Sequence, residues 1–477
     1  MLALLYYSSA WPAEMTWSVF YQFYACLCAN CVGIIYGITI GWASPSIPLL
    51  QSENSPLLSG PITEEQGSWI NSIMCVGGLA GTVFFGWMGD YFGRKWSLYL
   101  VAFPQIASYL LILIALDVEY LYISRFLGGF GGGGVFVLVP LFVTEIAEDH
   151  IRGALGACLI LVVNFGLFVG LTIGGYLEFF LAPLVPIGIL VIFLILFQFL
   201  PETPQYLLMR RRKEDAEKSF KFYRGFRKCY NDELPEKYSK EFSTLLKVFD
   251  RSSTEENDSG VHWKDFCVKS TRLAIIISFF LVMLACCCGT FALINYAASI
   301  FEDAGSSLQP NDAAIVVGVI QVIGSLLSYL LADRAGRRVL LMGSAFGTGL
   351  CHATMGVYLY LKYHDYNCDG FEWIPVVALS GVMLISAVGI VALPFPIMAE
   401  LVPTKLRSIV VSGAAAITWI VSFLLVKYFN DFVELIGLHG CIGFFTVCCF
   451  LEVFFVAFML PETKGKNFEE IVNLLSR

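Results

Sequence analysis

Long apolar segments are the feature of this sequence that most constrains its fold. A helix needs about 20 mostly apolar residues to cross the hydrocarbon core of a bilayer, and twelve blocks near or above that length can be marked. The chain is 57% hydrophobic and 14% charged, whereas a soluble domain carries about 25% charged residues. A β-barrel would show short alternating segments instead. The sequence therefore predicts an all-α integral membrane protein. The predicted spans are approximately residues 19–41, 68–88, 97–116, 121–144, 154–176, 180–200, 273–300, 312–332, 339–361, 374–399, 408–429 and 438–460.

The placement of lysine and arginine predicts the orientation of these spans. The segment 201–272 holds 16 of the 30 Lys and Arg residues, and cytoplasmic loops carry an excess of these residues. With twelve spans, this segment shares one side of the membrane with both termini. We therefore expect the segment and both termini in the cytoplasm, with residues 210–224 helical and residues 253–260 as a flexible linker. Three cations fall outside or at outer helix ends: Arg125, Lys362 and Lys427.

Three motif pairs occur in the same order in both parts of the chain. Asp90 and Asp333 are 243 residues apart, as are Gly93 and Gly336. Such a repeat predicts two six-helix halves with a substrate site near the membrane midplane between them. The paired motifs are residues 86–95 with 332–338, Glu145 and Arg152 with Glu400 and Arg407, and the Pro-Glu-Thr triplets 201–203 and 461–463. The predicted parts are an N-terminal half (1–200), a cytoplasmic helical linker (201–272), a C-terminal half (273–460) and a cytoplasmic tail (461–477).

All of these paired motifs fall at predicted cytoplasmic helix ends. There, carboxylates and guanidinium groups can form charge-assisted bonds between neighbouring helices. Orientation charges alone would account for the Arg residues but not for their matched acids. We interpret the set as an inter-helix latch that opens when the cytoplasmic side of the protein opens.

Several longer motifs resemble the sugar-porter branch of the major facilitator superfamily. The resemblance runs from about residue 30 to 472, and residues 41–50 and 400–403 are most similar to the insect facilitated trehalose transporters. It implies the major facilitator fold, with twelve transmembrane helices in two halves, a cytoplasmic helical insert and alternating access to a central sugar site. The matching motifs are GWMGDYFGRK (86–95), residues 124–156, PETPQYLL (201–208), DRAGRR (333–338), AELVPTKLR (399–407) and PETKGKNFEEI (461–471). The resemblance implies a cytoplasmic gating network of Asp90, Arg94, Glu145, Arg152, Asp333, Arg334, Arg338, Glu400 and Arg407.

The seventh span departs from the family where sugar contacts are expected. Residues 285–291 read ACCCGTF and occupy the place of the family's Gln-Gln-Leu-Ser-Gly-Ile-Asn. Only Gly289 remains, and we expect it to keep a helix break there. Four amide positions are lost, which at about 0.5–1.5 kcal/mol per hydrogen bond is roughly 2–6 kcal/mol. Glucose and trehalose are therefore expected to be poor ligands. The four positions are Ile160, Cys286, Phe291 and Thr418.

Two residues are expected to dominate substrate binding. Gln321 lies twelve residues before Asp333, where the family has an amide facing the cavity. Trp419 can stack on the apolar face of a pyranose and donate one N–H. Asn164 lies one helical turn from Ile160 and is a candidate replacement for the lost amide. The other candidate substrate-binding residues are Asn295, Tyr296, Phe291, Phe395 and Thr418.

Acidic residues inside the spans bear on energy coupling. Proton symporters of this family carry an acid in the first helix, where this chain has Ile38, and no acid occurs between Glu14 and Glu53. Because a buried acid is costly and usually functional, its absence argues against proton coupling. Glu452 is the exception, with functional and packing interpretations both open. His352 is interpreted as a polar contact between helices.

Three functions compete at this stage. They are facilitative uniport of a sugar or polyol such as trehalose or a hexose, uniport of a non-sugar substrate, and a non-transporting sensor or scaffold. The paired latch motifs favour the two transporters. The sequence lacks the residue constellations of an enzyme or a metal site, so no cofactor is expected. The expected partners are a small-molecule substrate and the lipid bilayer, with no nucleic acid.

The cellular location is predicted from the chain's C-terminal segment. We expect a multi-pass protein of the plasma membrane. Residues 470–475 fit an acidic dileucine sorting pattern, which would favour an endolysosomal address. The same residues also form the apolar face of a terminal amphipathic helix, and this second interpretation is preferred.

Overall fold

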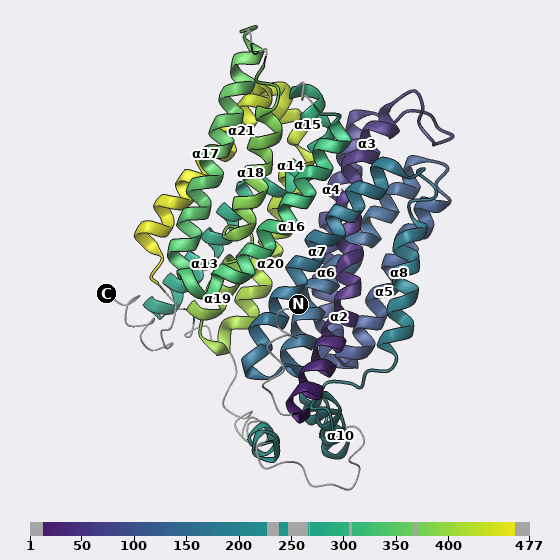
Figure 1. Cartoon of the computed structure of the whole chain (residues 1–477), viewed down its shortest axis with the longest axis vertical. Coiled ribbons are helices and arrows are strands. Elements are labelled where there is room, and N and C mark those ends of the chain that lie inside the picture. The colour runs from purple at the N-terminus through teal and green to yellow at the C-terminus, as the bar shows by residue number, and fades with distance from the viewer. Residues whose placement is uncertain are drawn as a thin grey trace.

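The computed structural model describes residues 13–226, 238–246, 266, 268–304, 308–366, 368 and 370–462, and over these ranges it contains helices and connecting turns without a strand. Two bundles of helices stand side by side, one from the first part of the chain and one from the second (Figure 1). The predicted linker 253–260 and the terminal segment 470–475 lie outside the described residues. The all-α fold predicted from the apolar blocks is confirmed.

Two helices of the N-terminal bundle start with a side-chain cap. Thr63 and Gln66 form a reciprocal capping box at the start of α4, and Asp117 accepts a backbone N–H at the start of α6. Such caps satisfy backbone donors that the first turn leaves free. The helices are α2 (Ala13–Gly41), α3 (Ala43–Gln51), α4 (Glu64–Phe92), α5 (Arg94–Leu113), α6 (Val118–Ile146), α7 (Asp149–Tyr176) and α8 (Leu184–Phe197).

The C-terminal bundle repeats this arrangement with more interruptions. Its helices are α13 (Lys269–Cys287), α14 (Thr290–Asn295), α15 (Ala297–Ala304), α16 (Pro310–Ala335), α17 (Arg337–Tyr363), α18 (Ile374–Val388), α19 (Pro394–Leu401), α20 (Thr404–Lys427) and α21 (Phe429–Met459). Between the bundles in sequence lie the short helices α9 (Pro204–Met209) and α10 (Lys213–Tyr223). They mark what we call the insert end of the molecule, at the bottom of Figure 1.

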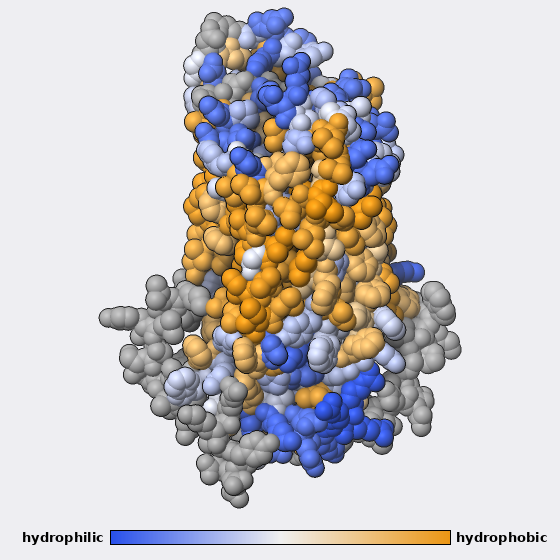
Figure 2. Space-filling view, turned by 90° about the vertical axis from the view of Figure 1, so that its right-hand side faces the viewer, coloured by the Kyte–Doolittle hydropathy of each residue, from blue (hydrophilic) through white to orange (hydrophobic). Residues whose placement is uncertain are grey.

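The helices have the length and composition of membrane spans. Within the described ranges, nine helical segments are long and apolar enough to cross a membrane, and α8 and α18 are shorter apolar helices. On the face shown in Figure 2, a broad hydrophobic band separates hydrophilic surfaces at the two ends. Such a band is what a bilayer core requires of the surface that it contacts.

Two predicted spans are broken rather than continuous. The break predicted at Gly289 is confirmed: this residue has a φ of +78° and separates α13 from α14. A Cβ at this position would lie 2.6 Å from the Phe445 ring, so both the backbone and the packing require glycine. The span predicted as 374–399 is wrong as one helix. It ends at Val388 and restarts at Pro394, because proline has no N–H to continue a helix.

Glycines bring α4 and α6 into backbone contact. A Cβ at Gly81 would lie 2.0 Å from the Phe130 carbonyl oxygen, and one at Gly133 would lie 2.2 Å from the Gly78 carbonyl oxygen. Small residues permit this approach in apolar helix pairs. The glycine-rich run near residue 130 therefore fixes the position of α4, which in turn packs against α20 of the other half. On another contact between the halves, α7 packs against α16.

Candidate functional site

A buried ion pair ties α5 to α6 at the insert end. Arg94 donates from Nε and Nη2 to Glu145 Oε1, each at 2.8 Å. The two side chains are only 4% and 6% exposed. Thr203 donates its hydroxyl to the second carboxylate oxygen of Glu145. Every oxygen of this carboxylate thus has a donor, as a buried charge requires.

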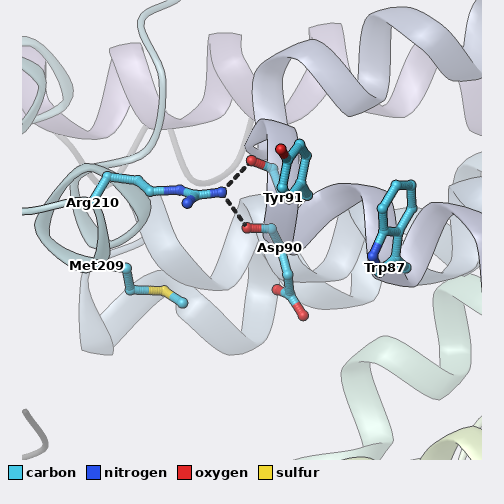
Figure 3. Close-up of a pocket in the computed structure, with 5 residues that line it drawn as sticks. All are labelled: Trp87, Asp90, Tyr91, Met209 and Arg210. Atoms are coloured by element: carbon cyan, nitrogen blue, oxygen red, sulfur yellow. Dashed lines mark hydrogen bonds between the residues drawn. The ribbon is translucent and has the colours of Figure 1, made fainter.

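The Asp90 side chain occupies a different position from its neighbour Arg94. Its carboxylate is 71% exposed and lies 3.5 Å from Arg94 Nη1. Figure 3 shows it pointing away from Arg210, whose guanidinium instead reaches the backbone carbonyls of Asp90 and Tyr91. These residues line a surface recess of about 340 Å³ together with Trp87. Arg210 was not expected in this network, since it lies in the insert rather than in a paired motif.

The two Pro-Glu-Thr motifs supply matched helix caps. Glu202 accepts the backbone N–H groups of Arg94 and Lys95, at 3.1 and 3.0 Å, at the start of α5. Burial raises the pKa of the Glu202 carboxyl above its ordinary value, although these N–H donors act in the opposite direction. A carboxylate at this place also interacts favourably with the helix dipole.

Glu462 caps the start of α17 as Glu202 caps the start of α5. Its carboxylate accepts the backbone N–H groups of Arg337 and Arg338 at 3.1 and 3.2 Å. The glycines preceding the two capped helices, Gly93 and Gly336, have φ values of +97° and +87°. The repeat found in the sequence therefore corresponds to a repeated turn and cap in space.

In the C-terminal half, Glu400 contacts Arg337 rather than one of the predicted arginines. The Arg337 Nε lies 3.5 Å from Glu400 Oε1, and Glu400 Oε2 is buried without a hydrogen-bond partner. Arg337 follows Gly336 as Arg94 follows Gly93, so the 243-residue spacing contained the signal that identifies it.

The remaining predicted gating residues are placed as follows. Arg338 donates to the Ala457 carbonyl oxygen, and the Arg407 Nε is buried without a hydrogen-bond partner. Arg152 is exposed and donates to the Ala147 carbonyl oxygen at 3.4 Å. The side chains of Asp333 and Arg334 lie outside the described residues.

A further acid, Glu148, joins the insert to the first helix. Its carboxylate accepts bonds from Ser18 and from Gln22 Nε2, the latter at 3.0 Å, and lies 3.9 Å from Arg224 Nε. Arg224 also donates to the Ile146 carbonyl oxygen at 2.8 Å. Burial alone would raise the pKa of Glu148, but these donors and the Arg224 charge outweigh it, and the pKa lies below its ordinary value. Glu148 lies within the matching segment 124–156, but it was not among the predicted gating residues.

Between the halves, Gln321 and Asn164 bond directly to each other. Gln321 Nε2 donates to Asn164 Oδ1 at 3.2 Å, and Asn164 Nδ2 donates to Ser325 Oγ. The Ser325 hydroxyl donates in turn to the Gln321 carbonyl oxygen at 2.9 Å. These residues come from α7 and α16 and form a closed loop of three hydrogen bonds. Gln321 Oε1 is buried and has no hydrogen-bond partner.

Trp419 bridges the halves at a second place. Its Nε1 donates to Thr82 Oγ1 at 3.0 Å, and the Thr82 hydroxyl donates to the Gly78 carbonyl oxygen at 2.8 Å. A Cβ at Gly78 would lie 2.6 Å from the indole ring, so the ring packs directly on α4. The Tyr36 ring lies 6.4 Å away, edge to face. The N-terminal half thus covers the Trp419 ring in this conformation.

Three other candidate substrate-binding residues, Asn295, Tyr296 and Thr418, each donate to a backbone carbonyl of the C-terminal half. Asn295 Nδ2 donates to the Phe291 carbonyl oxygen at 2.7 Å, and Tyr296 donates to the Val426 carbonyl oxygen at 3.0 Å. Thr418 bonds back to its own helix at Ala414. Phe291 is half-buried, whereas Phe395 is 38% exposed. The structure therefore joins Gln321 to Asn164 but does not bring Asn295, Tyr296 or Thr418 into that loop.

At the end opposite the insert, the halves are bonded to each other. The Ala298 backbone N–H donates to Ser44 Oγ at 3.0 Å, and Tyr176 donates to Asp312. Lys427 donates to Ser68 Oγ at 2.8 Å and lies 4.6 Å from the centre of the Trp69 ring. This end of the interface is therefore held closed.

Two buried ionisable residues have very different surroundings. Arg125, expected at an outer helix end, lies near the start of α6, is fully buried and donates to the carbonyl oxygens of Ile70 and Thr39. Backbone carbonyls replace water at its Nε and Nη1, while its Nη2 is buried without a hydrogen-bond partner. Glu452 is also fully buried, but neither of its oxygens has a hydrogen-bond partner. The contact predicted for His352 is confirmed, since its Nε2 lies 3.1 Å from the Cys288 carbonyl oxygen.

Comparison with known families and sequences gives a consistent result. The family described as "Sugar (and other) transporter" matches residues 57–475. A relative from Culex quinquefasciatus named facilitated trehalose transporter Tret1 is 30% identical over 466 residues, covering 96% of this chain and 87% of the relative. One of the same name from Drosophila yakuba is 30% identical over 450 residues, covering 94% of this chain and 51% of the relative. The chain thus spans about half the length of the Drosophila relative.

Solved structures support the fold. The proton:xylose symporter XylE, bound to 6-bromo-6-deoxy-D-glucose, superimposes with a TM-score of 0.74 at 20% identity, over 96% of this chain and 100% of that one. The inward-open form of the xylose transporter XylE from E. coli gives a TM-score of 0.75 at 19% identity, over 95% and 99% of the two chains. The predicted major facilitator fold is confirmed.

Proposed function

We propose, from the premise that this chain belongs to the sugar (and other) transporter family, that it carries a sugar or polyol across a membrane by facilitated diffusion. The protein would alternate between states open to one side and to the other. A substrate site at the midplane between two halves is the general arrangement for such transporters. The two insect relatives are named as trehalose transporters, so a disaccharide and its component hexose are the first substrates to test.

One observation carries the proposal: uncharged hydrogen-bonding side chains meet across the interface between the halves. Gln321 and Asn164 form one such contact, and Trp419 and Thr82 form the other. Buried polar groups in a membrane protein are costly and mark functional sites. Amide and indole N–H groups are donors that suit sugar hydroxyls. If the two halves rock apart, these groups become available to a substrate.

The surroundings of Arg125 support uniport rather than proton-driven transport. The residue at the first-helix acid position, Ile38, is fully buried. Arg125 in the same half is bonded to backbone carbonyls, and a carbonyl cannot exchange a proton as a carboxylate can. We therefore infer that substrate moves down its own gradient.

The charges at the insert end are assigned a gating role. The Arg94–Glu145 pair joins helices within the N-terminal half, and the Arg337–Glu400 pair does so within the C-terminal half. Asp90, Arg152, Arg338 and Arg407 lie beside these pairs, and Asp333 and Arg334 belong to the matching motif. We infer that this set changes partners when the insert end opens or closes. We infer a cytoplasmic insert end and cytoplasmic termini from the lysine and arginine bias. We propose the plasma membrane because residues 470–475 are interpreted as the face of an amphipathic helix rather than as a sorting signal.

The test is uptake into proteoliposomes of labelled D-glucose, trehalose and sorbitol. We expect saturable, low-affinity uptake of at least one of them, unchanged by an inward proton gradient. Gln321→Ala and Trp419→Ala should each reduce it, because each removes a main remaining contact; an unmet buried hydrogen bond costs about 1–3 kcal/mol. Uptake that is tight and indifferent to both substitutions would place the site elsewhere. Accumulation driven by protons and lost in Glu452→Gln would overturn the uniport mechanism.

A further inference from the structure

We propose that Thr82 and Ser325 are internal ligands of the substrate site. Their hydroxyl groups accept the N–H bonds of Trp419 and Asn164, and so compete with the hydroxyl groups of a sugar or polyol for the same donors. The inference rests on the proposed sugar or polyol transport and extends it. It assigns a role in setting substrate affinity to two residues that no motif marks.

The two contacts have the same chemistry. Each hydroxyl donates its hydrogen to the carbonyl oxygen four residues earlier in its own helix, Thr82 to Gly78 and Ser325 to Gln321. The hydrogen of each hydroxyl is thus committed, and its oxygen is left as an acceptor. A hydroxyl group offers one hydrogen and two lone pairs, which are also what each hydroxyl group of a sugar offers.

The two contacts are reciprocal between the halves. Thr82 belongs to the N-terminal half and accepts a bond from Trp419 of the C-terminal half. Ser325 belongs to the C-terminal half and accepts a bond from Asn164 of the N-terminal half. Each half therefore provides one donor for substrate and one hydroxyl that occupies the other half's donor. Separating the halves breaks both contacts at once and frees both donors.

Burial increases the effect of this competition on substrate affinity. Thr82, Ser325, Asn164 and Trp419 are all buried, so an N–H that loses its acceptor there remains unsatisfied. Removing a hydroxyl therefore destabilises the closed interface between the halves but leaves the substrate's own contacts with the donors in place. Substrate binding should become easier, because it no longer has to displace an internal acceptor. We expect KM to fall about three- to tenfold, the change that corresponds to one net hydrogen bond.

The experiment measures KM and kcat of uptake for two hydroxyl deletions that keep side-chain size, Thr82→Val and Ser325→Ala. The wild type is first tested with labelled D-glucose, trehalose and sorbitol. Thr82→Ser keeps the hydroxyl and should match the wild type. Ser328→Ala is the matched control, because Ser328 is a buried serine of the same helix whose hydroxyl bonds within its own half, to Val388 at 3.0 Å. Its KM should not fall.

A second arm tests the hydrogen bond itself. In a Trp419→Phe background, which lacks the indole N–H, Thr82→Val should no longer change KM. A simple packing role of Thr82 would persist in that background. The inference is supported if KM falls in both deletions while kcat changes less, with both controls at the wild-type value. It is overturned if KM is unchanged or rises in the two deletions.

Uptake by the wild-type protein distinguishes a failure of the proposed function from a failure of this inference alone. If the wild-type protein transports none of D-glucose, trehalose and sorbitol, the proposed sugar or polyol transport and the inference that rests on it both fail. If the wild type transports one of them and the deletions leave its KM unchanged, only the role of Thr82 and Ser325 is wrong.

Discussion

The two halves carry the same charge motif at the insert end, but they use it differently. In the N-terminal half, Arg94 and Glu145 are buried and doubly bonded, and Thr203 completes the carboxylate. In the C-terminal half, Arg337 meets Glu400 through one contact of 3.5 Å between side chains that are 21% and 32% exposed. One Glu400 oxygen has no hydrogen-bond partner.

The insert accounts for much of this difference. Thr203 and Arg210 lie at the start of the insert and bond to Glu145 and to the end of α4. Arg224, one residue after α10, lies beside Glu148. The N-terminal half is thus bonded to the insert through side chains, whereas the Arg337–Glu400 contact lies between partly exposed side chains. We interpret the N-terminal network as a fixed base and the C-terminal pair as the part that exchanges partners.

The largest difference is expected from matched arginine deletions. Arg94→Ala leaves the Glu145 carboxylate buried without its cation, and breaking a buried pair in this way costs about 3–5 kcal/mol. Arg337→Ala removes a longer contact between more exposed side chains, so we expect the smaller loss of stability from this variant. Thermal unfolding of the two variants in detergent measures the contrast. Equal losses of stability in the two variants would mean that the two ion pairs contribute equally, which would contradict this difference between the halves.

A smaller contrast is expected at the two capped turns. Gly93 and Gly336 both have positive φ with extended ψ, a conformation that costs a non-glycine residue about 1–3 kcal/mol. A Cβ at Gly93 would also lie 2.3 Å from Glu202 Oε2, whereas at Gly336 the corresponding distance to Glu462 is 3.1 Å. Gly93→Ala should therefore destabilise more than Gly336→Ala in the same unfolding assay. The reverse order would contradict the described caps.

The smallest effect is expected from pH and belongs to the N-terminal half. The pKa of Glu148 lies below its ordinary value. Its contacts therefore contribute stability that is fully present above the ordinary carboxyl pKa of about 4.3, and lost as the pH falls through the lowered pKa. We expect the unfolding temperature to fall over this acidic range, and to fall less in Glu148→Gln. Identical pH profiles for the two proteins would exclude Glu148 from this role.

The sequence predicted the fold well because its signals are local. Apolar blocks mark the helices without any knowledge of distant neighbours, whereas the break at Gly289 was expected from the resemblance to the family. The repeat spacing would also have identified Arg337, had it been applied to the residue after each glycine. The breaks around Pro394 were missed because a membrane span tolerates single prolines, so apolar composition alone could not fix its ends.

The contacts between the halves were harder to predict. Asn164 and Gln321 were both candidates, but their direct bond joins helices distant in sequence. Thr82 and Ser325 gave no signal, because a hydroxyl that bonds back to its own helix is ordinary in an apolar span. Arg125 was assigned to a helix end on charge alone. Its burial depends on carbonyls of α4 and α2, which only the packed structure brings together.

The claim that transport requires the two halves to separate at the end opposite the insert is tested most directly by a cross-link. Ser44 and Ala298 are in hydrogen-bond contact across the halves, so Ser44→Cys with Ala298→Cys should form a disulfide under mild oxidation. We expect the oxidised double variant to lose uptake of the sugar that the wild type transports, and reduction to restore it. The wild type treated identically controls for its native cysteines. A cross-linked protein that transports at the wild-type rate would contradict alternating access between these halves.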